Sequence, residues 1–438
     1  MGPFLHIAGG WGCSLRIAEQ ILRKSIIASE RRSTSREDAG RFTRAIRNYP
    51  VTASVAMPYA LLILPSAILN ENPSLGFIVG VFLIAFLTAL LFETFLAFVE
   101  ARTPTRTFKQ KDFSEHRKFL RNLGVFLMFF GLAASLITAS MGVGTIDSAV
   151  GVSTASTSAI ATILSLLSGW DVVGTGLVVW ARSNDAMKSR SFYLIVIVAL
   201  GLKLLHVIML GITVQLWRYL ICVFFLLMYY RLIRFRTIIA VMLVVLVIWP
   251  VFFEVRNQIR SDRGIAVSAQ VDAADRLRYD LQIARADGIP PGLDLGQLDD
   301  PLEILRFGLI PRVLDSDRSE VSTGRLINQY LGGTATSAFT FLPVTTSYVL
   351  GNWYGTVMLY AWWSIFTFVL LRNGARSSPY RVVIFAFLLV GPLNWFSVHP
   401  DSAIGFLQDL VAASPVLLFI AFHTRQRTRL RSAYEDVS

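Results

Sequence analysis

Ten arginines and no lysine lie between Glu254 and Thr340 of this 438-residue chain. They are Arg256, Arg260, Arg263, Arg276, Arg278, Arg285, Arg306, Arg312, Arg318 and Arg325. Thirteen acidic residues make the same stretch slightly negative, so its net charge does not explain the preference for arginine. A planar guanidinium can bind two oxygens of one phosphate or carboxylate, whereas lysine offers a point charge. The stretch therefore predicts a site for a polyanionic ligand.

The rest of the chain is dominated by apolar segments that could cross a membrane. Hydrophobic residues make up 54% of the sequence and charged residues 16%, against about 25% charged residues in a typical soluble protein. A spanning helix needs about 20 mostly apolar residues. The candidate segments are 51–69, 76–98, 123–142, 158–181, 192–210, 214–230, 237–253, 348–371, 382–397 and 403–423. The sixth and ninth are the weakest, being short or interrupted by Gly391-Pro392. We expect an all-α, polytopic membrane bundle of about ten helices.

The distribution of basic residues predicts the orientation of these spans. Of the 41 lysines and arginines, 29 lie in the termini and in the loops on the same side as the termini. The opposite loops carry only the ten arginines of the long stretch, and long loops are not governed by the positive-inside rule. We therefore expect cytoplasmic termini and an extracytoplasmic arginine-rich loop. Topology and contact with anionic lipids explain the net charge of +12, and nucleic acid is not an expected partner.

These patterns divide the chain into five regions. They are a basic cytoplasmic segment (1–50), seven spans (51–253), the large arginine-rich extracytoplasmic loop (254–347), three further spans (348–423) and a basic cytoplasmic tail (424–438). The loop is expected to be partly helical, because Asp272–Ala286 has amphipathic spacing and a second helix is expected from Pro301. Pairing with nearby acids is the favoured interpretation for three of its arginines, Arg276, Arg278 and Arg285.

Near the end of this loop, the chain carries an ordered set of motifs. In sequence order they are Pro311-Arg312, Asp317-Arg318, Gly324, Tyr348 and Gly355. This order resembles the O-antigen polymerase (Wzy-type) family, which is related to the O-antigen ligases. That family has a Pro-Arg pair, an Asp-Lys pair, a glycine and then a Gly-Glu-x-Tyr segment. Thr346 stands where the family usually has glutamate, so no acid–base role is carried over to this position.

The resemblance implies a glycosyltransferase reaction at the outer face of the bacterial inner membrane. A glycan would be transferred from a polyprenyl diphosphate to the non-reducing end of another lipid-linked repeat unit. Fixed cations stabilise the charge that builds on the departing diphosphate. Arg256 and Arg260, one helical turn apart beyond a span, and Arg312 are the first candidates to bind it. The second choices, with pairing to acids as the alternative, are Arg218, Arg318 and Arg325.

A transferase of this kind also needs a group that accepts the proton of the attacking hydroxyl. His399 is the only histidine expected on the extracytoplasmic side, and its unperturbed pKa suits that role. The alternative is a solvated loop histidine next to the turn-forming Pro400. The competing bases are Asp401, Asp315, Asp317 and Glu254.

Ionisable residues inside spans are further candidates, because burying them unpaired in a membrane is costly. Lys203 and His206 are one turn apart in the fifth span and could line the floor of an extracytoplasmic cavity with Arg218. The alternative is an internal ion pair or a polar helix contact. Glu93 lies near the cytoplasmic end of its span. At this position a side chain that extends toward water and a side chain with a function are equally good interpretations. Tyr348, from the family-like segment, completes the expected substrate contacts.

Aromatic residues near the expected outer boundary fit a membrane-interface belt, with sugar stacking as the less favoured interpretation. They are Tyr330, Trp353, Tyr354, Trp395 and Phe396. No cluster of histidine, cysteine and carboxylate residues has metal-ligand spacing, so we expect a metal-independent reaction without a cofactor. The expected partners are a polyprenyl-diphosphate-linked oligosaccharide and membrane lipids, and a chain-length regulator is a further candidate.

The sequence leaves three alternative functions open. An O-antigen ligase shares the architecture and the lipid-diphosphate donor but transfers the glycan to a lipid A core. A transporter or flippase for the same lipid would leave glycan length unchanged, and such proteins typically show repeated halves and broken helices at mid-membrane. A membrane scaffold explains the apolar spans but not the choice of arginine.

Overall fold

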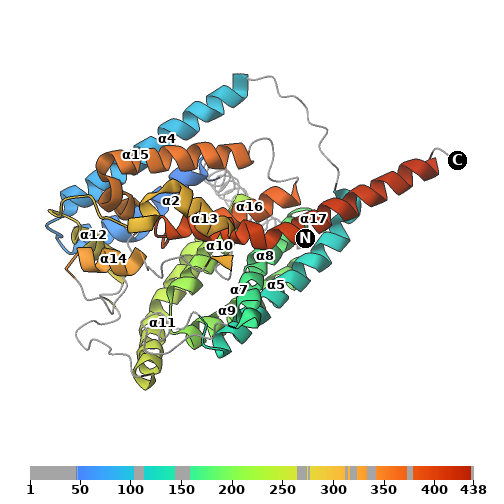
Figure 1. The fold of residues 1–438 in the computed structure, drawn as a ribbon, viewed down its shortest axis with the longest axis horizontal. Helices are drawn as coiled ribbons and strands as arrows, with labels where there is room; N and C mark the ends of the chain where they lie inside the picture. The colour runs from blue at the N-terminus through green and yellow to red at the C-terminus, as the bar shows by residue number, and fades with distance from the viewer. Residues whose placement is uncertain are drawn as a thin grey trace, which may run out of the picture.

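The fold is a bundle of helices, seen in a computed structural model that describes most of the chain (Figure 1). The described residues are 46, 48–102, 113–143, 158–263, 274, 277–310, 314–315, 323–332, 342–371 and 378–435. Within these ranges there is no β-strand. Eight candidate spans are long and apolar enough to cross a membrane. This confirms the prediction of a helical membrane bundle.

The candidate spans follow the expected apolar segments. The eight are α2 (Pro50–Pro58) with η1 (Tyr59–Ile63) and α3 (Leu64–Leu69), α4 (Leu75–Arg102), α5 (Arg117–Ser140), α7 (Ala159–Ser168) with α8 (Trp170–Ser183), α9 (Ser189–Leu210), α11 (Phe235–Asp262), α15 (Pro343–Leu371) and α17 (Asp401–Glu435). The sixth and ninth segments form shorter apolar helices, α10 (Val214–Tyr229) and α16 (Pro379–Val390). The remaining elements are η2 (Ser114–His116), α12 (Tyr279–Ala284), η4 (Gly296–Asp299), α13 (Pro301–Leu309) and α14 (Thr323–Tyr330).

Glycine contacts bring α5 and α8 together, with α7 and α9 beside them (Figure 1). A Cβ atom at Gly124 would lie 2.8 Å from the Cβ of Leu177. One at Gly131 would lie 2.2 Å from the backbone nitrogen of Asp171. A side chain at either position would force the helices apart, and small residues are typical of such close contacts between membrane helices. The contact holds the start of α8 in the interior of the bundle.

The fourth span is interrupted near its middle. α7 ends at Ser168 and α8 begins at Trp170, with Gly169 between them. The buried Asp171 therefore lies in the first turn of α8, where the helix dipole favours a negative charge. The Trp170 indole nitrogen donates to the carbonyl of Ala412 (2.8 Å), which holds this interruption against α17.

α15 consists of two helical segments that fold back on each other. Gly351 and Asn352 have non-helical backbone angles, and Asn352 has a positive φ of 59°. Ser347 Oγ lies 3.2 Å from Thr356 Oγ1, whereas a straight helix would separate these two residues by roughly 14 Å along its axis. The expected span 348–371 therefore loses its first residues to this turn. The longer segment of α15 lies along α4 (Figure 1).

Glu93 of α4 caps the N-terminus of α2. Its buried carboxylate accepts hydrogen bonds from the backbone N–H groups of Val51 and Thr52, each 2.9 Å long, and from the Thr52 hydroxyl at 2.6 Å. α2 has no side-chain cap of its own, so Glu93 supplies the acceptors that a first helical turn lacks. Glu93 thus joins two helices and does not reach toward water.

α13 attaches the segment between α11 and α15 to the bundle. It begins at Pro301, as predicted, and the Asp300 side chain caps it by accepting from the backbone nitrogen of Leu302 (2.8 Å). The helix packs on α17, where the Gln408 side-chain amide donates to the carbonyl of Phe307 (2.9 Å). This contact holds the first part of α17 against α13.

Asp280 of α12 makes a second attachment. Its buried carboxylate accepts hydrogen bonds from Ser66 (2.7 Å), Asn72 (2.9 Å) and Arg278 (3.0 Å). Burial favours the neutral carboxyl, but the three hydrogen bonds outweigh it and lower the pKa of Asp280. Within the predicted helix 272–286 the structure describes α12, while residues 272–273 and 275–276 lie outside the described part.

Candidate functional site

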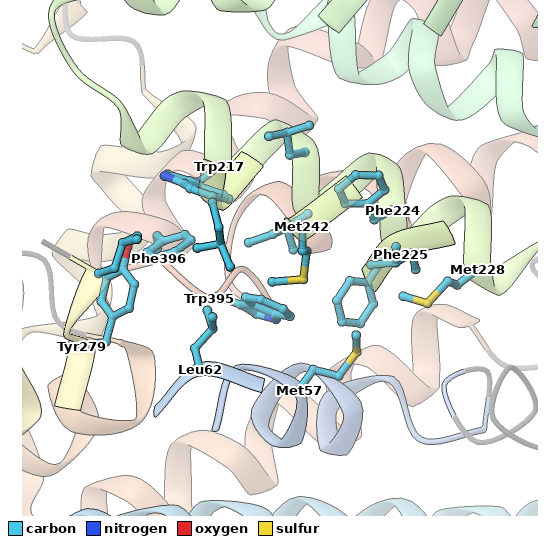
Figure 2. A pocket seen from close by; sticks show the side chains of 15 residues that line it. Met57, Leu62, Trp217, Phe224, Phe225, Met228, Met242, Tyr279, Trp395 and Phe396 are labelled. Carbon is cyan, nitrogen blue, oxygen red and sulfur yellow. The ribbon is translucent and has the colours of Figure 1, made fainter. Parts of the chain in front are cut away.

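An apolar groove runs along α10, between α2 and α11. Its volume is about 630 Å³, open space included. Side chains at helical spacing on α10 and α11 form two of its walls. Figure 2 shows Tyr279, Phe396 and Trp217 together at one end of the groove and Met228 at the other. The lining residues are Met57, Leu62, Trp217, Leu220, Ile221, Phe224, Phe225, Met228, Ile238, Met242, Leu246, Leu277, Tyr279, Trp395 and Phe396.

Aromatic rings build the end of the groove nearest the start of α10. The centre of the Trp217 ring lies 5.8 Å from that of Trp249 and 6.0 Å from that of Phe396. The Tyr279 ring lies 5.4 Å from Phe396, and the Trp249 ring 6.2 Å from Phe253. These are distances of interacting rings. Of these contacts, the one between Trp217 and Trp249 joins α10 to α11, which is the least buried of the eight candidate spans.

Arg218 lies at this aromatic end. Its Nη2 donates to the carbonyl of Phe396 (3.1 Å), and its own carbonyl accepts from the side-chain amide of Asn394 (3.1 Å). α10 is thereby joined to the segment between α16 and α17. The Nε of Arg218 is buried and has no hydrogen-bond partner among the described residues. Such a donor can bind an anionic oxygen.

Arg256 lies at the same end, on α11. Its guanidinium carbon is 4.3 Å from the centre of the Phe253 ring, which belongs to the aromatic cluster. Its Nε and Nη2 donate to the side-chain oxygen of Asn257 at 3.2 and 2.6 Å. Arg218 and Arg256 therefore flank one set of rings, from α10 and α11 respectively.

Arg260, one turn beyond Arg256, faces a helix end instead. Its Nε donates to the carbonyl of Gly211 (3.0 Å), and Nη2 of Arg263 donates to the carbonyl of Met209 (2.7 Å). α9 ends at Leu210, and the capping residue that follows, Gly211, has a left-handed φ of 69°. The last carbonyls of a helix lack partners within the helix, so both arginines cap α9. The structure gives Arg260 this capping role, and its binding of diphosphate stays a prediction.

Two further arginines of the loop pair with acids. Arg278 lies 3.0 Å from Asp280, which agrees with the favoured interpretation of Arg278 as a paired residue. Arg306 lies 3.2 Å from Glu303 and 2.5 Å from Asp315. Arg325 is in α14, but its side chain is not described. Four residues named from the sequence lie outside the described residues: Arg276, Arg312, Arg318 and Asp317.

His399 and Asp401 lie at the start of α17, next to the segment that lines the groove. His399 is half-buried, and its Nδ1 has no hydrogen-bond partner in the described part of the chain. Burial lowers the pKa of His399 to about 4, so its imidazole is neutral at pH 7. Asp401 is exposed and accepts a hydrogen bond from the Thr323 hydroxyl (2.5 Å). A neutral imidazole can accept a proton, although its low pKa makes it a weaker base than an ordinary histidine.

Tyr348 lies just before the turn of α15 and packs between two rings. Its ring centre is 5.1 Å from that of Phe77 and 4.7 Å from that of Trp353. These contacts support the fold-back of α15 against α4. The structure thus gives Tyr348 a packing role, and its contact with substrate stays a prediction.

A buried ion pair joins α9 to the interrupted fourth span. Lys203 Nζ lies 2.8 Å from Asp171 Oδ2. This agrees with the internal ion pair that the sequence analysis gave as the alternative to a role of Lys203 in the floor of a cavity. The ammonium is also 5.4 Å from the centre of the Tyr219 ring, and the Tyr219 hydroxyl lies 2.7 Å from Thr175 Oγ1. Asp409 of α17 adds a second carboxylate, which lies next to Gly169 at the interruption of the fourth span. His206, on the same helix as Lys203, is half-buried.

Our reading of the sequence missed Asp171 and Asp409. Each is the single acidic residue of its expected span, 158–181 or 403–423. An acid within a membrane segment signals a partner or a function by itself, so this signal was present in the sequence. Its partner could not be chosen without the structure, because Lys203 lies on another helix.

The groove is lined by apolar and aromatic residues, and Arg218 and Arg256 lie outside this lining, next to the rings of its aromatic end. An apolar groove with cations near one end suits an amphiphile that has a long apolar chain and an anionic head. No family model, curated protein or solved structure matches the chain. Among the described residues, no group of three or more histidine, cysteine or acidic side chains could hold a metal ion. The arrangement can bind an anionic head through Arg218 and Arg256, and His399 can accept a proton at the start of α17.

Proposed function

We propose that this chain is a membrane glycosyltransferase that polymerises polyprenyl-diphosphate-linked oligosaccharide repeat units. In this proposal it works on the outer face of the bacterial inner membrane. About ten spans, with α10 and α16 among them, leave both termini in the cytoplasm and the segment 254–347 outside. The apolar groove, with Arg218 and Arg256 at its aromatic end, is the observation that carries the proposal.

The donor lies with its isoprenoid chain along α10. The groove suits such a chain because its lining is made of hydrocarbon and aromatic side chains. The diphosphate lies at the aromatic end, bound by Arg218 and Arg256, with Arg312 of the family-like segment as a third ligand. Cations held in place before the reaction stabilise the charge that builds on the leaving group. Arg260 stays a further candidate for this set, although its Nε also donates to the carbonyl of Gly211 at the end of α9.

In the reaction, the acceptor hydroxyl oxygen attacks the anomeric carbon of the donor glycan. A C–O bond to the acceptor forms as the C–O bond to the diphosphate breaks, and the electron pair of the broken bond leaves with the lipid diphosphate. The hydroxyl proton passes to His399, with Asp401 as the alternative base. His399 is available for this step because its lowered pKa keeps it neutral at pH 7.

The test uses purified protein in lipid with a polyprenyl-diphosphate-linked repeat unit, resolving glycan size on a gel with and without EDTA. A ladder that survives EDTA supports a metal-independent polymerase. One transfer to a lipid A core, without a ladder, favours an O-antigen ligase instead. Recovery of intact substrate with either acceptor contradicts the glycosyltransferase proposal.

A transporter for the same lipid-linked oligosaccharide is the second candidate, because one observation favours it. The fourth span is interrupted at Gly169, and Asp409 and the Asp171–Lys203 pair lie at this interruption. Broken helices with ionisable side chains inside the membrane are typical of transporters. In proteoliposomes, a transporter moves intact lipid-linked units across the bilayer and loses this activity in Asp171→Asn. If Asp171→Asn moves lipid-linked units across the bilayer as fast as wild type does, the Asp171–Lys203 pair does not support a transport function.

A further inference from the structure

The 391–400 segment, between α16 and α17, is buried but not helical. α16 has 12 residues and is therefore about 18 Å long, less than the roughly 30 Å of a bilayer's hydrocarbon core. The chain leaves α16 inside the bundle, and residues 392–398 are all buried. Non-helical backbone at membrane depth needs hydrogen-bond partners within the protein. This segment therefore depends on polar side chains that supply such partners.

Asn394 supplies three of these hydrogen bonds and is 1% exposed. Its amide nitrogen donates to the carbonyls of Leu389 (2.8 Å) and Arg218 (3.1 Å). Its side-chain oxygen accepts from the backbone nitrogen of Phe396 (3.1 Å). Leucine has a similar shape but no polar atoms, and aspartate has no donors when it is ionised. The amide thus joins the end of α16, the first part of α10 and a residue that lines the groove.

These hydrogen bonds close a ring that holds Arg218 twice. Its carbonyl accepts from Asn394, and its Nη2 donates to the carbonyl of Phe396 (3.1 Å), whose own N–H donates to Asn394. The main chain and the guanidinium of Arg218 are therefore bound to the same short segment. A free arginine side chain loses much rotamer freedom when it is ordered. Here that ordering is complete before any ligand binds, and the buried Nε has no hydrogen-bond partner among the described residues.

The same segment also positions the aromatic end of the groove. Trp395 and Phe396 line the groove from it (Figure 2), and the Phe396 ring lies 6.0 Å from that of Trp217. Asn394 lies directly before these two residues in the chain. Its hydrogen bonds therefore fix the distance between the Arg218 guanidinium and the apolar wall.

We propose that Asn394 is a positioning residue of the transferase site, which holds the Arg218 guanidinium in register with the aromatic end of the groove. The inference rests on the proposed function, because it concerns the diphosphate of the donor. Both N–H donors of Asn394 are already used, so it acts through Arg218 and is not itself a ligand. Cations fixed before binding stabilise a developing anion without a further cost of reorganisation.

The test compares two probes that share an apolar chain and differ in the head. Tritium-labelled farnesyl diphosphate and farnesol are bound to the protein in immobilised lipid nanodiscs, with empty nanodiscs subtracted. Asn394→Leu should weaken farnesyl diphosphate about 10-fold, the lower end of the range for a hydrogen bond to a charged group. The affinity for farnesol should not change. Equal affinity of wild type and Asn394→Leu for farnesyl diphosphate overturns the proposal, as does an equal loss for both probes.

Asn184→Leu is the matched control. The Asn184 amide also donates to a carbonyl at a helix end, that of Trp180 (2.8 Å) in α8, and Asn184 does not line the groove. Both variants should melt at a lower temperature, but only Asn394→Leu should change the ratio of the two affinities. If Asn394→Leu does not fold, Asn394→Gln decides, because it keeps the amide and displaces it by one methylene. A wild-type ratio in Asn394→Gln then overturns the proposal.

A double-mutant cycle separates positioning from a general effect on the fold. Arg218→Met alone should weaken farnesyl diphosphate, and Asn394→Leu should cause no further loss of affinity in the Arg218→Met background. Fully additive losses overturn the proposal, because Asn394 would then act without Arg218. Failure of wild type to bind farnesyl diphosphate more tightly than farnesol also overturns it.

The glycan assay gives a result that is independent of this one. If the ratio of the affinities depends on Asn394 but no glycan is transferred, the positioning role stands and the polymerase is contradicted. If a ladder forms with the same kcat and donor KM in wild type and Asn394→Leu, the polymerase stands and the positioning role is overturned.

Discussion

The guanidinium of Arg218 donates a hydrogen bond to the carbonyl of Phe396 over 3.1 Å, although 178 residues separate the two in the chain. The Phe396 ring lines the groove and lies 6.0 Å from the ring of Trp217, the residue that precedes Arg218. One hydrogen bond thus brings a cation and two aromatic rings to the same end of an apolar groove. The proposed binding of a lipid diphosphate depends on this arrangement.

Arg256→Lys should lower glycan transfer about 100-fold, the lower end of the loss expected when one group that stabilises a developing anion is removed. Lysine keeps the positive charge but cannot bind two oxygens at once. The measurement is kcat on the lipid-linked repeat unit, with expression and melting temperature as controls for folding. Arg306→Lys is the matched control, because Arg306 pairs with Glu303 and Asp315 on α13. Near-normal turnover in Arg256→Lys would remove Arg256 from the diphosphate site.

Met242→Trp should fill the groove and lower turnover at least roughly 10-fold by excluding the isoprenoid chain, since overpacking a well-formed space is unfavourable. Met242 lines the groove from α11. Leu243→Trp is the control on the same helix, because Leu243 is 58% exposed on the outside of the bundle. The initial rate is measured at several donor concentrations. Equal KM for the donor in Met242→Trp and wild type would show that the chain binds elsewhere.

Lys203→Met should destabilise the protein by about 3–5 kcal/mol, because it leaves the buried carboxylate of Asp171 without its partner. The double variant Lys203→Met with Asp171→Asn should recover most of this loss, since it removes both charges. Thermal unfolding of the two single variants and the double variant gives the coupling energy. Asp185→Asn is the control, because Asp185 forms an exposed pair with Arg182 at 3.4 Å, worth at most about 1 kcal/mol. Additive effects of the two single substitutions would contradict a tight pair.

The acid limb of the pH profile should lie near pH 4 if His399 is the base. Burial lowers the pKa of His399 to about 4, so the neutral form that accepts a proton is present above that pH and is lost below it. An ordinary histidine would place this limb at about 6.5. The measurement is kcat from pH 3.5 to 8, with His399→Asn expected to abolish the limb and most activity. If the pH profile of kcat is unchanged in His399→Asn, Asp401 is the base instead of His399.

Asp280→Asn should destabilise the protein at pH 7 by about 1.5–3 kcal/mol, the range for hydrogen bonds to a charged group. The pKa of Asp280 is lowered in the folded protein. Its ionised form therefore contributes stability above the unfolded pKa of about 3.9, and this contribution is lost as the pH falls through the lower folded pKa. The difference between the variant and wild type should shrink below that pH in thermal unfolding. Asp287→Asn, at an exposed acid nearby, should show neither effect.

The helical elements could be predicted from local patterns in the sequence. Runs of about 20 apolar residues specify membrane helices locally, and the two weakest runs are the two shortest apolar helices, α10 and α16. The start of α13 is also specified by local sequence, since Asp300 caps the helix and Pro301 is its first residue. The fold-back of α15 at Gly351 and Asn352 was not predicted, because the segment 348–371 was expected to be one span.

The contacts of the charged side chains depend on how the helices pack. Arg256 and Arg260 are equivalent in the sequence, yet one lies beside the aromatic end of the groove and the other caps α9 through Gly211, 49 residues away. Lys203 meets Asp171, 32 residues away on another helix. Hydrophobic periodicity reports the environment of one helix at a time, whereas the partner of a charge depends on how separate helices pack. The spans could therefore be predicted from the sequence, and the site could not.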